Sequence, residues 1–199
     1  MGQVWIILAA DRARSNLARM RGETDRAKLD RLMRELGGRL SGEGRIYLTG
    51  GGTAVWEGWR EMTIDADLKA EPELPGFYEA IAELKESIDI NIELASPDDF
   101  IPPLPGWRER SPFVARHGRI DFHHFDLFSQ ALSKIERGHA RDLADVAEML
   151  RRGLVDRGNL WRYFNVIEAN LVRYPAIEPR VFRDSVLAVV KDADSLPGA

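Results

Sequence analysis

The hydrophobic period of this chain changes near Asp126, and this change restricts the possible folds more than any other feature of the sequence. Before that residue, several short segments carry apolar side chains at every second position, the period of a strand with one buried face. After it, apolar side chains recur every three or four positions, as in amphipathic helices. These helical segments are residues 127–135, 143–150, 160–171 and 181–190. We therefore expect an α/β (α+β) protein, with a small mixed β-sheet flanked by helices and a C-terminal helical lobe.

Length and composition fit one domain with an appended helical part. The chain has 199 residues, of which 44% are hydrophobic and 30% charged, and this is too apolar for a disordered protein. We expect an N-terminal extension over residues 1–23, an α/β domain over residues 24–125 and a helical region over residues 126–199.

Charge and cysteine content exclude several classes of function. The formal net charge of −4 argues against a surface coated with phosphate-binding Lys and Arg, so any nucleic-acid contact should be local. The absence of cysteine excludes disulfides, thiol nucleophiles and Cys-ligated zinc. The apolar run from Val4 to Ala10 is far shorter than the roughly 20 residues that span a bilayer. We therefore expect no membrane partner and a cytoplasmic location.

Three consecutive glycines, residues 50–52, lie at a predicted turn from strand to helix. The β-rich run 45–49 predicts a strand before them, and residues 53–60 predict a short helix after them. Because glycine lacks a Cβ, Gly51 and Gly52 can expose N–H groups to a phosphate at the start of that helix. A tight turn without ligand is the alternative.

Two aspartates follow on one face of a predicted strand. Residues 63–69 alternate, with Thr63, Asp65, Asp67 and Lys69 on one face and Ile64, Ala66 and Leu68 on the other. Carboxylates two positions apart on a strand lie roughly 6 to 7 Å apart at their Cα atoms, and their oxygens can converge on one or two Mg²⁺ ions. Asp65 and Asp67 are therefore candidate metal ligands and catalytic residues, although a solvated strand face would show the same alternation.

A third carboxylate would come from the next predicted strand, residues 88–94. Its apolar face is formed by Ile88, Ile90, Ile92 and Leu94, and its polar face by Asp89, Asn91 and Glu93. We select Glu93 because it lies nearest the end of the strand, where a sheet is open to ligand. Asp89 remains an alternative.

The remaining segments supply the framework. Helices are predicted over residues 24–36, ended by Gly37 and Gly38, and over residues 77–84. Residues 101–106 read as a loop because of their prolines, and residues 113–122 as a hairpin broken at His117 and Gly118.

An aspartate, two histidines and four tryptophans outside these strands have predicted structural or binding roles. Asp126 is a candidate helix N-cap. The adjacent His123 and His124 would point to opposite faces of a strand, so we interpret them as structural. We expect Trp56, Trp59, Trp107 and Trp161 to be core or domain contacts, and Trp107, in a Pro-rich loop, is also a candidate lip for a nucleotide.

The ordered run GGTAVWEGWREMTIDADL, residues 51–68, resembles the signature of the nucleotidyltransferase superfamily, the DNA polymerase β-like fold. Within that superfamily it is similar to the AbiEii-type toxins and their bacterial relatives. The matching residues are Gly51, Gly52, Ala54, Gly58, Arg60, Thr63, Asp65, Asp67 and Leu68. The phosphate loop of P-loop enzymes and the dinucleotide fingerprint both fail, because Thr53-Ala54 and Val55 stand where those motifs need other residues.

A second match lies in residues 126–146, where the family has a lysine before an Arg-Asp pair and a further Asp. The matching residues are Asp126, Leu127, Lys134, Arg137, Arg141, Asp142 and Asp145. The resemblance implies that Lys134 contacts a phosphate of the nucleotide. The solvated side of a helix, with ion pairs between helices, is the alternative for these charges.

The resemblance implies Mg²⁺-dependent transfer of a nucleoside monophosphate from an NTP to an acceptor, which would be an RNA such as tRNA or a protein hydroxyl. The implied metal-binding and catalytic residues are Asp65, Asp67 and Glu93, and the implied nucleotide-binding residues are Gly51, Gly52, Thr53, Arg60 and Lys134. It also implies a place in a toxin–antitoxin system, with a cognate protein partner. Two alternatives stay open: a catalytically inactive nucleotide- or partner-binding member of the fold, and a purely structural interaction protein.

Overall fold

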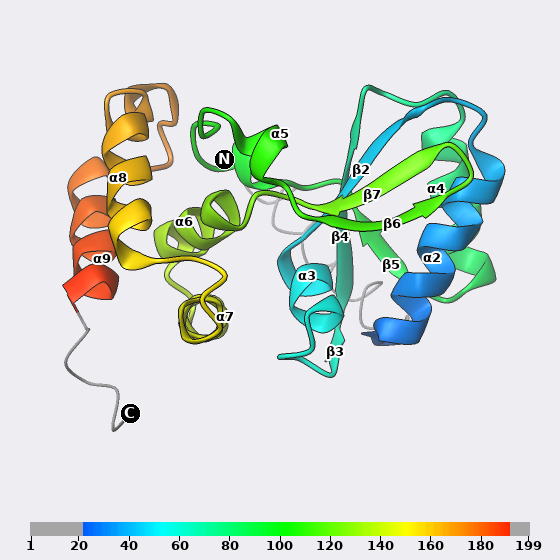
Figure 1. Ribbon diagram of the computed structural model, residues 1–199, viewed down its shortest axis with the longest axis horizontal. Helices are drawn as coiled ribbons and strands as arrows, with labels where there is room; N and C mark the ends of the chain where they lie inside the picture. Colours follow the sequence, from blue (N-terminus) through cyan, green and yellow to red (C-terminus); the bar gives the residue numbers. More distant parts are fainter. Residues whose placement is uncertain (1–21, 192–199) are drawn as a thin grey trace, which may run out of the picture. The chain divides into compact units, whose positions relative to one another are not determined.

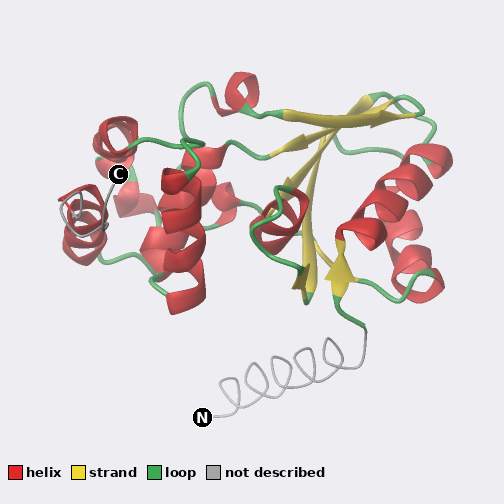
Figure 2. Ribbon diagram, turned by 60° about the horizontal axis from the view of Figure 1, so that its bottom comes forward, coloured by secondary structure: helices red, strands yellow, loops and turns green. Residues whose placement is uncertain are grey.

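The computed structural model describes residues 22–191 and consists of helices and a mixed sheet (Figure 2), which confirms the α+β class. The described chain divides into two compact units. Unit 1 comprises residues 22–94 and Val114–His123, and unit 2 comprises Ala95–Phe113 and residues 124–191. Nearly all of the expected N-terminal extension, and residues 192–199, lie outside the described residues.

The units differ in one respect from the domains expected from the sequence. The last of the three crossings between units, at His124, lies close to the expected boundary at residues 125 and 126. The segment Ala95–Phe113, however, belongs to the helical unit. Its apolar side chains Ile101, Leu104 and Trp107 are buried, which gives this proline-rich segment a place in a core.

Unit 1 is built on a five-stranded sheet with the order β5-β4-β2-β7-β6 (Figure 1). Its strands are β2 (Gly44–Thr49), β4 (Asp65–Glu71), β5 (Asn91–Glu93), β6 (Phe113–His117) and β7 (Ile120–His124). Strand β4 pairs antiparallel with β2 and parallel with β5, so the sheet is mixed. The predicted hairpin of β6 and β7 is present, and it turns at Gly118 and Arg119, one residue later than the predicted break at His117 and Gly118.

One face of this sheet is covered by helices α2 (Arg26–Arg39) and α4 (Phe77–Ser87), which lie together on that side in Figures 1 and 2. The buried cluster combines side chains of α2, α4 and the sheet: Leu29, Leu32, Leu36, Phe77, Ile81, Leu84, Ile46, Leu48, Ala66, Leu68, Ile92 and Phe122. Because strand side chains alternate, Asp65 and Asp67 belong to the opposite face from Ala66 and Leu68.

The prediction that Gly37 and Gly38 end the first helix is wrong, since α2 continues to Arg39 and Leu40 ends it with an extended backbone. Gly37 has a different role. A Cβ on it would lie 2.4 Å from the backbone oxygen of His117, and a Cβ on Gly118 would lie 2.3 Å from the oxygen of Gly37. Gly37 is therefore the position where the helix touches the β6–β7 turn, and only glycine fits there.

The predicted strand over residues 63–69 is also interrupted. Strand β4 begins at Asp65, while Met62–Thr63 forms a short strand, β3, that pairs with β1 (Thr24–Asp25) in a separate two-stranded sheet. Ile64, expected to be buried beside Ala66, is 40% exposed, whereas Thr63 is buried. The alternation is confirmed from Asp65 onward and fails at Ile64, where the chain leaves one sheet for the other.

The strand predicted over residues 88–94 is shorter than expected, because β5 covers Asn91–Glu93 alone. Asp89 has a positive φ of 50°, a left-handed conformation that cannot continue a strand. Ile88, Ile90 and Ile92 are buried as predicted, but Leu94 lies beyond the strand and is exposed.

Unit 2 is helical, and Figure 1 draws α8 and α9 side by side in orange and red. Its elements are η1 (Pro97–Asp99), α5 (Trp107–Arg110), α6 (Leu127–Arg137), α7 (Ala140–Arg151), α8 (Arg157–Glu168), η2 (Leu171–Arg173) and α9 (Pro179–Lys191). The core between α8 and α9 includes Phe164 and Phe182, whose rings meet edge to face at 5.0 Å. The helical C-terminal region is thus confirmed. Within residues 22–191, no helix has the length and apolar character needed to cross a membrane.

Candidate functional site

The glycine run lies at the end of β2 and forms the first turn of helix α3 (Gly50–Trp56). The helix therefore begins earlier than the residues 53–60 predicted for it. Gly50 has a positive φ of 58°, and a Cβ on it would lie 2.2 Å from Oδ2 of Asp67. The backbone of the glycine turn and the Asp67 carboxylate are thus in direct contact, and a side chain at residue 50 would separate them.

The other two glycines differ from each other in what they touch. A Cβ on Gly51 would lie 2.1 Å from Oγ1 of Thr63, so this position also depends on glycine. A Cβ on Gly52 would meet Leu29 at 3.9 Å, an ordinary contact. Thr53 is fully buried and its hydroxyl donates to the carbonyl oxygen of Leu48 at 3.2 Å. If Thr53 contacts a nucleotide, it does so through its backbone.

Asp65 and Asp67 lie half-buried on β4, which runs between β2 and β5. Asp67 is paired with Thr49 on β2 and with Glu93 on β5. Asp65 is paired with Asn91 on β5. The side-chain amide of Asn91 donates a hydrogen bond to Oδ1 of Asp65. The structure therefore brings Asp65, Asp67 and Glu93 onto neighbouring positions of two adjacent strands.

The two candidates for the third carboxylate have different surroundings. Glu93 is exposed at the end of β5, directly in register with Asp67. Asp89 precedes the strand, and its carboxylate accepts a hydrogen bond from the backbone N of Gly22 at 3.0 Å. The carbonyl oxygen of Asp89 accepts another from Nζ of Lys28 at 3.0 Å. Asp89 thus fastens the start of β5, and of the two residues only Glu93 is paired with β4.

The donor set suits a hard divalent cation. Carboxylate oxygens are the ligands that Mg²⁺ prefers, and it commonly takes one or two of them together with water and substrate phosphates. Among residues 22–191, no group of three or more Asp, Glu or His side chains is gathered closely enough to hold a metal ion. Asp65, Asp67 and Glu93 therefore do not form a closed three-carboxylate site in the described residues, and metal binding by Asp65 and Asp67 stays a prediction.

Three motif residues after the glycines close the end of α3. The backbone N–H groups of Gly58, Trp59 and Arg60 all donate to the carbonyl oxygen of Ala54, at 3.1, 3.1 and 3.2 Å. Gly58 has a positive φ of 80°, which lets the chain reverse there. Arg60 is thereby held half-buried just after this turn.

Lys134 lies in unit 2, in a buried ion-pair cluster between α6 and α7. Its side chain is 3% exposed, and its Nζ lies 2.9 Å from Oδ1 of Asp142 and 2.6 Å from Oδ2 of Asp145. Arg137 donates to the same Oδ1 of Asp142 at 3.0 Å. Lys134 is buried and not solvated, but the ion pairs between helices that the alternative predicts are present, because two carboxylates of α7 surround its ammonium group. A contact between Lys134 and a nucleotide stays a prediction.

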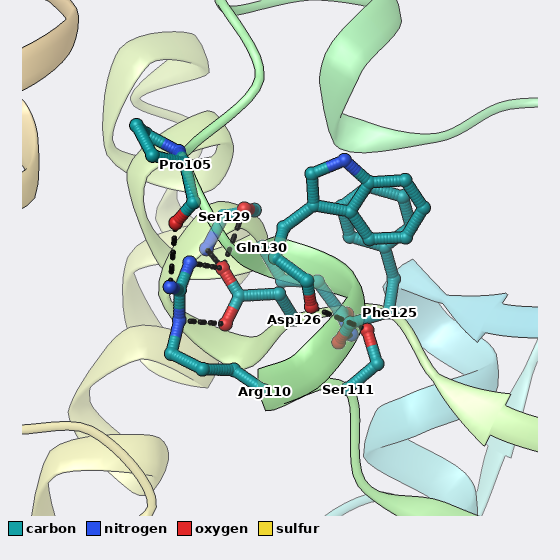
Figure 3. Close-up of polar contacts among 8 residues, drawn as sticks. Pro105, Arg110, Ser111, Phe125, Asp126, Ser129 and Gln130 are labelled. Carbon is teal, nitrogen blue, oxygen red and sulfur yellow. Dashed lines mark hydrogen bonds and ion pairs between the residues drawn. The ribbon is translucent and has the colours of Figure 1, made fainter.

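Asp126 is confirmed as the N-cap of α6, and it is also the acceptor of a bidentate arginine (Figure 3). Oδ2 of Asp126 accepts from the N of Ser129 at 3.1 Å and from its hydroxyl at 2.7 Å. Nε and a terminal nitrogen of Arg110 each donate to one oxygen of Asp126 at 3.0 Å. Another nitrogen of Arg110 donates to the carbonyl of Pro105 at 2.7 Å, so this cluster fastens the loop before α5 to α6.

The ion pair with Asp126 raises the pKa of Arg110. Burial alone would lower the pKa of Arg110, but the hydrogen bonds from Arg110 to Asp126 and the negative charge of Asp126 outweigh that effect. The pKa of the guanidinium is therefore raised above its ordinary value. Arg110 therefore stays charged at neutral pH.

Comparison with protein-family models, with curated proteins and with solved structures finds no match. The resemblance to nucleotidyltransferases consequently depends on the two motifs alone, and the relationship stays a prediction.

The structure corrects one candidate and adds others that the sequence analysis did not assign. Trp107 is buried, and its ring stacks on Phe125 with centroids 4.2 Å apart, so the expected core role is confirmed and the alternative of a nucleotide lip is wrong. The sequence does not identify Arg110, because its partner Asp126 lies outside the local pattern around it. It does not single out Asn91, because the carboxylates on the same strand face are the more obvious metal ligands. For Asn91 a signal was present, since it shares the polar strand face with Glu93.

Proposed function

We propose that this protein is a Mg²⁺-dependent nucleotidyltransferase that moves a nucleoside monophosphate from an NTP to an RNA or protein acceptor. The observation that carries the proposal is the contact between the glycine turn and Asp67, where Gly50 lies against the carboxylate oxygen. A phosphate-binding backbone and metal-binding carboxylates would be neighbours in such an enzyme, because the carboxylates would hold the Mg²⁺ that neutralises the charge of the phosphates.

Each residue has a defined part in the proposed reaction. Asp65 and Asp67, with Glu93 in register beside Asp67, hold the cations, and the backbone of Gly51 and Gly52 holds the departing phosphates. Bound Mg²⁺ supplies charge neutralisation and orientation of the phosphates. The acceptor hydroxyl loses its proton to solvent, and its oxygen forms a bond to the α-phosphorus. The bond from that phosphorus to the oxygen shared with the β-phosphorus breaks, and pyrophosphate leaves. A protein with these parts acts mainly by positioning and by electrostatic stabilisation.

The proposal is tested by incubating the full chain with each α-labelled NTP, Mg²⁺ and total RNA or protein. We expect label transfer that needs Mg²⁺. In Asp65→Asn, which keeps the shape but removes one charge, the rate should fall by roughly 100-fold or more, because metal charge stabilisation provides several kcal/mol. The control is Asp30→Asn on α2, which removes a surface acid paired with Arg34 and should leave transfer unchanged. Transfer of equal rate in Asp65→Asn would refute the proposal.

A second candidate function is nucleotide or partner binding without turnover, by an inactive member of the same fold in a toxin–antitoxin pair. One observation favours it: Lys134, the cation implied for phosphate contact, already has two carboxylates within ion-pair distance. Binding alone would raise the melting temperature, by about 5 to 10 °C at 100 times the dissociation constant, without label transfer. Transfer abolished in Asp65→Asn would exclude this candidate.

A further inference from the structure

We infer that Asn91 is a positioning residue for Asp65, an inference that rests on the proposed function. The side-chain amide of Asn91 donates a hydrogen bond to Oδ1 of Asp65. The two residues are Cα partners on the adjacent parallel strands β5 and β4, and both are half-buried. The contact is therefore fixed by the sheet and partly shielded from water.

The register that creates this contact is set by the turn before β5. Asp89 adopts a left-handed backbone, and its carboxylate and carbonyl accept hydrogen bonds from Gly22 and Lys28. These bonds fix where β5 begins. A slip of one residue would bring a buried isoleucine to the position opposite Asp65 and turn every side chain of the strand to the other face.

The chemistry of an amide suits the task of orienting a metal-binding carboxylate. The amide N–H occupies Oδ1, which leaves Oδ2 of Asp65 for a cation. Because the amide is neutral, it orients the carboxylate without neutralising the charge that the cation needs. An Asp at residue 91 would offer no donor and would repel Asp65, whereas a Lys or Arg would compete with the cation. Partners of this kind commonly change metal affinity 10- to 100-fold when they are removed.

The test measures Mn²⁺ binding to the full chain by electron paramagnetic resonance, in the presence of a non-hydrolysable NTP analogue. Asn91→Leu keeps the size of the side chain and removes the donor. We expect its dissociation constant for Mn²⁺ to rise at least about tenfold. The Mg²⁺ concentration for half-maximal transfer should rise by the same factor, with a smaller change in kcat at saturating Mg²⁺. Asn91→Thr, which retains a hydroxyl donor on a side chain suited to strands, should recover part of the affinity.

Two controls separate positioning from a general structural effect. Asn165→Leu removes an exposed amide that donates to the carbonyl of Trp161 within α8, and should change neither quantity. In the Asp65→Asn background, Asn91→Leu should change Mn²⁺ affinity less than twofold, because its effect acts through Asp65.

The outcomes distinguish the inference from the proposed function. If the wild-type chain binds Mn²⁺ and transfers nucleotide, and Asn91→Leu does both within twofold of it, the inference is wrong and the function stands. An equal loss in both backgrounds also overturns the inference. If the wild-type chain neither binds Mn²⁺ nor transfers, the proposed function fails and the inference falls with it.

Discussion

The contact between Gly50 and Asp67 gives the sharpest prediction about this protein. In Gly50→Ala, the backbone at a φ of 58° would have to hold a Cβ in the left-handed region, which costs roughly 1 to 2 kcal/mol. For a domain of this size, such a loss lowers the melting temperature by about 2 to 8 °C. The new Cβ would also be 2.2 Å from Oδ2 of Asp67, so the carboxylate must move by about 1 Å to restore ordinary contact. A displacement of that size in a catalytic site can reduce turnover about 100-fold.

Gly76→Ala is the matched control for that variant. Gly76 lies in the same unit with a φ of 77°, but a Cβ there would meet nothing within 4 Å. Both variants should therefore lose a similar free energy of unfolding in urea, since the end of a side chain can give way at little cost. Only Gly50→Ala should lose Mg²⁺-dependent nucleotide binding and transfer. Equal function in the two variants would refute the reasoning that the glycine turn and Asp67 form one site.

Two further predictions concern the framework. Gly37→Ala should lose about 2 to 3 kcal/mol of unfolding free energy, because its Cβ would be 2.4 Å from the backbone oxygen of His117, which cannot move aside. In Gly38→Ala the new Cβ would meet nothing within 4 Å, so this variant should gain about 0.5 to 1 kcal/mol of unfolding free energy through helix propensity. Urea unfolding of both variants checks this, and equal stabilities would contradict it. Lys134→Met should lose about 3 to 5 kcal/mol, since it leaves Asp142 and Asp145 without their shared cation in a buried setting. A stable Lys134→Met variant with weakened nucleotide binding would instead identify Lys134 as a ligand-binding residue.

The parts of the fold that the sequence predicts well are those set by local period. Helix α4 and the four C-terminal helices follow apolar residues at spacings of three and four, and β2 and the β6–β7 hairpin follow short β-rich runs bounded by turns. The face of β4 that carries Asp65 and Asp67 follows from alternation alone, because Ala66 and Leu68 must reach the core. Asp126 was predictable as a cap because its side chain acts on residues next to it in the chain.

The errors occur where a distant segment decides the local structure. Gly37 reads as a helix terminator, but contact with the His117 turn makes it a close-packing position inside the helix. Ile64 reads as a buried strand residue, but pairing of β3 with β1 moves it out of the five-stranded sheet. Trp107 in its proline-rich loop can be read as a core residue or as a nucleotide lip, and its stacking on Phe125 decides for the core. None of these partners can be deduced from period or propensity, since each lies outside the local window that such patterns describe.

The first motif combines two kinds of residue that the sequence alone presents as one signature. Gly58 and Ala54 build the reversal after α3, where three N–H groups share the Ala54 carbonyl, so these residues are explained by local structure whatever the protein does. Gly51 and Asp67, together with Gly50 just before the motif, are different, because the absence of Cβ at the two glycines brings backbone against Oδ2 of the half-buried Asp67 and Oγ1 of the buried Thr63. A turn that served chain reversal alone would tolerate a looser contact with an apolar neighbour. The nucleotidyltransferase proposal therefore depends on Gly50, Gly51, Asp65 and Asp67, and mutations at these positions test it more directly than mutations at the rest of the motif.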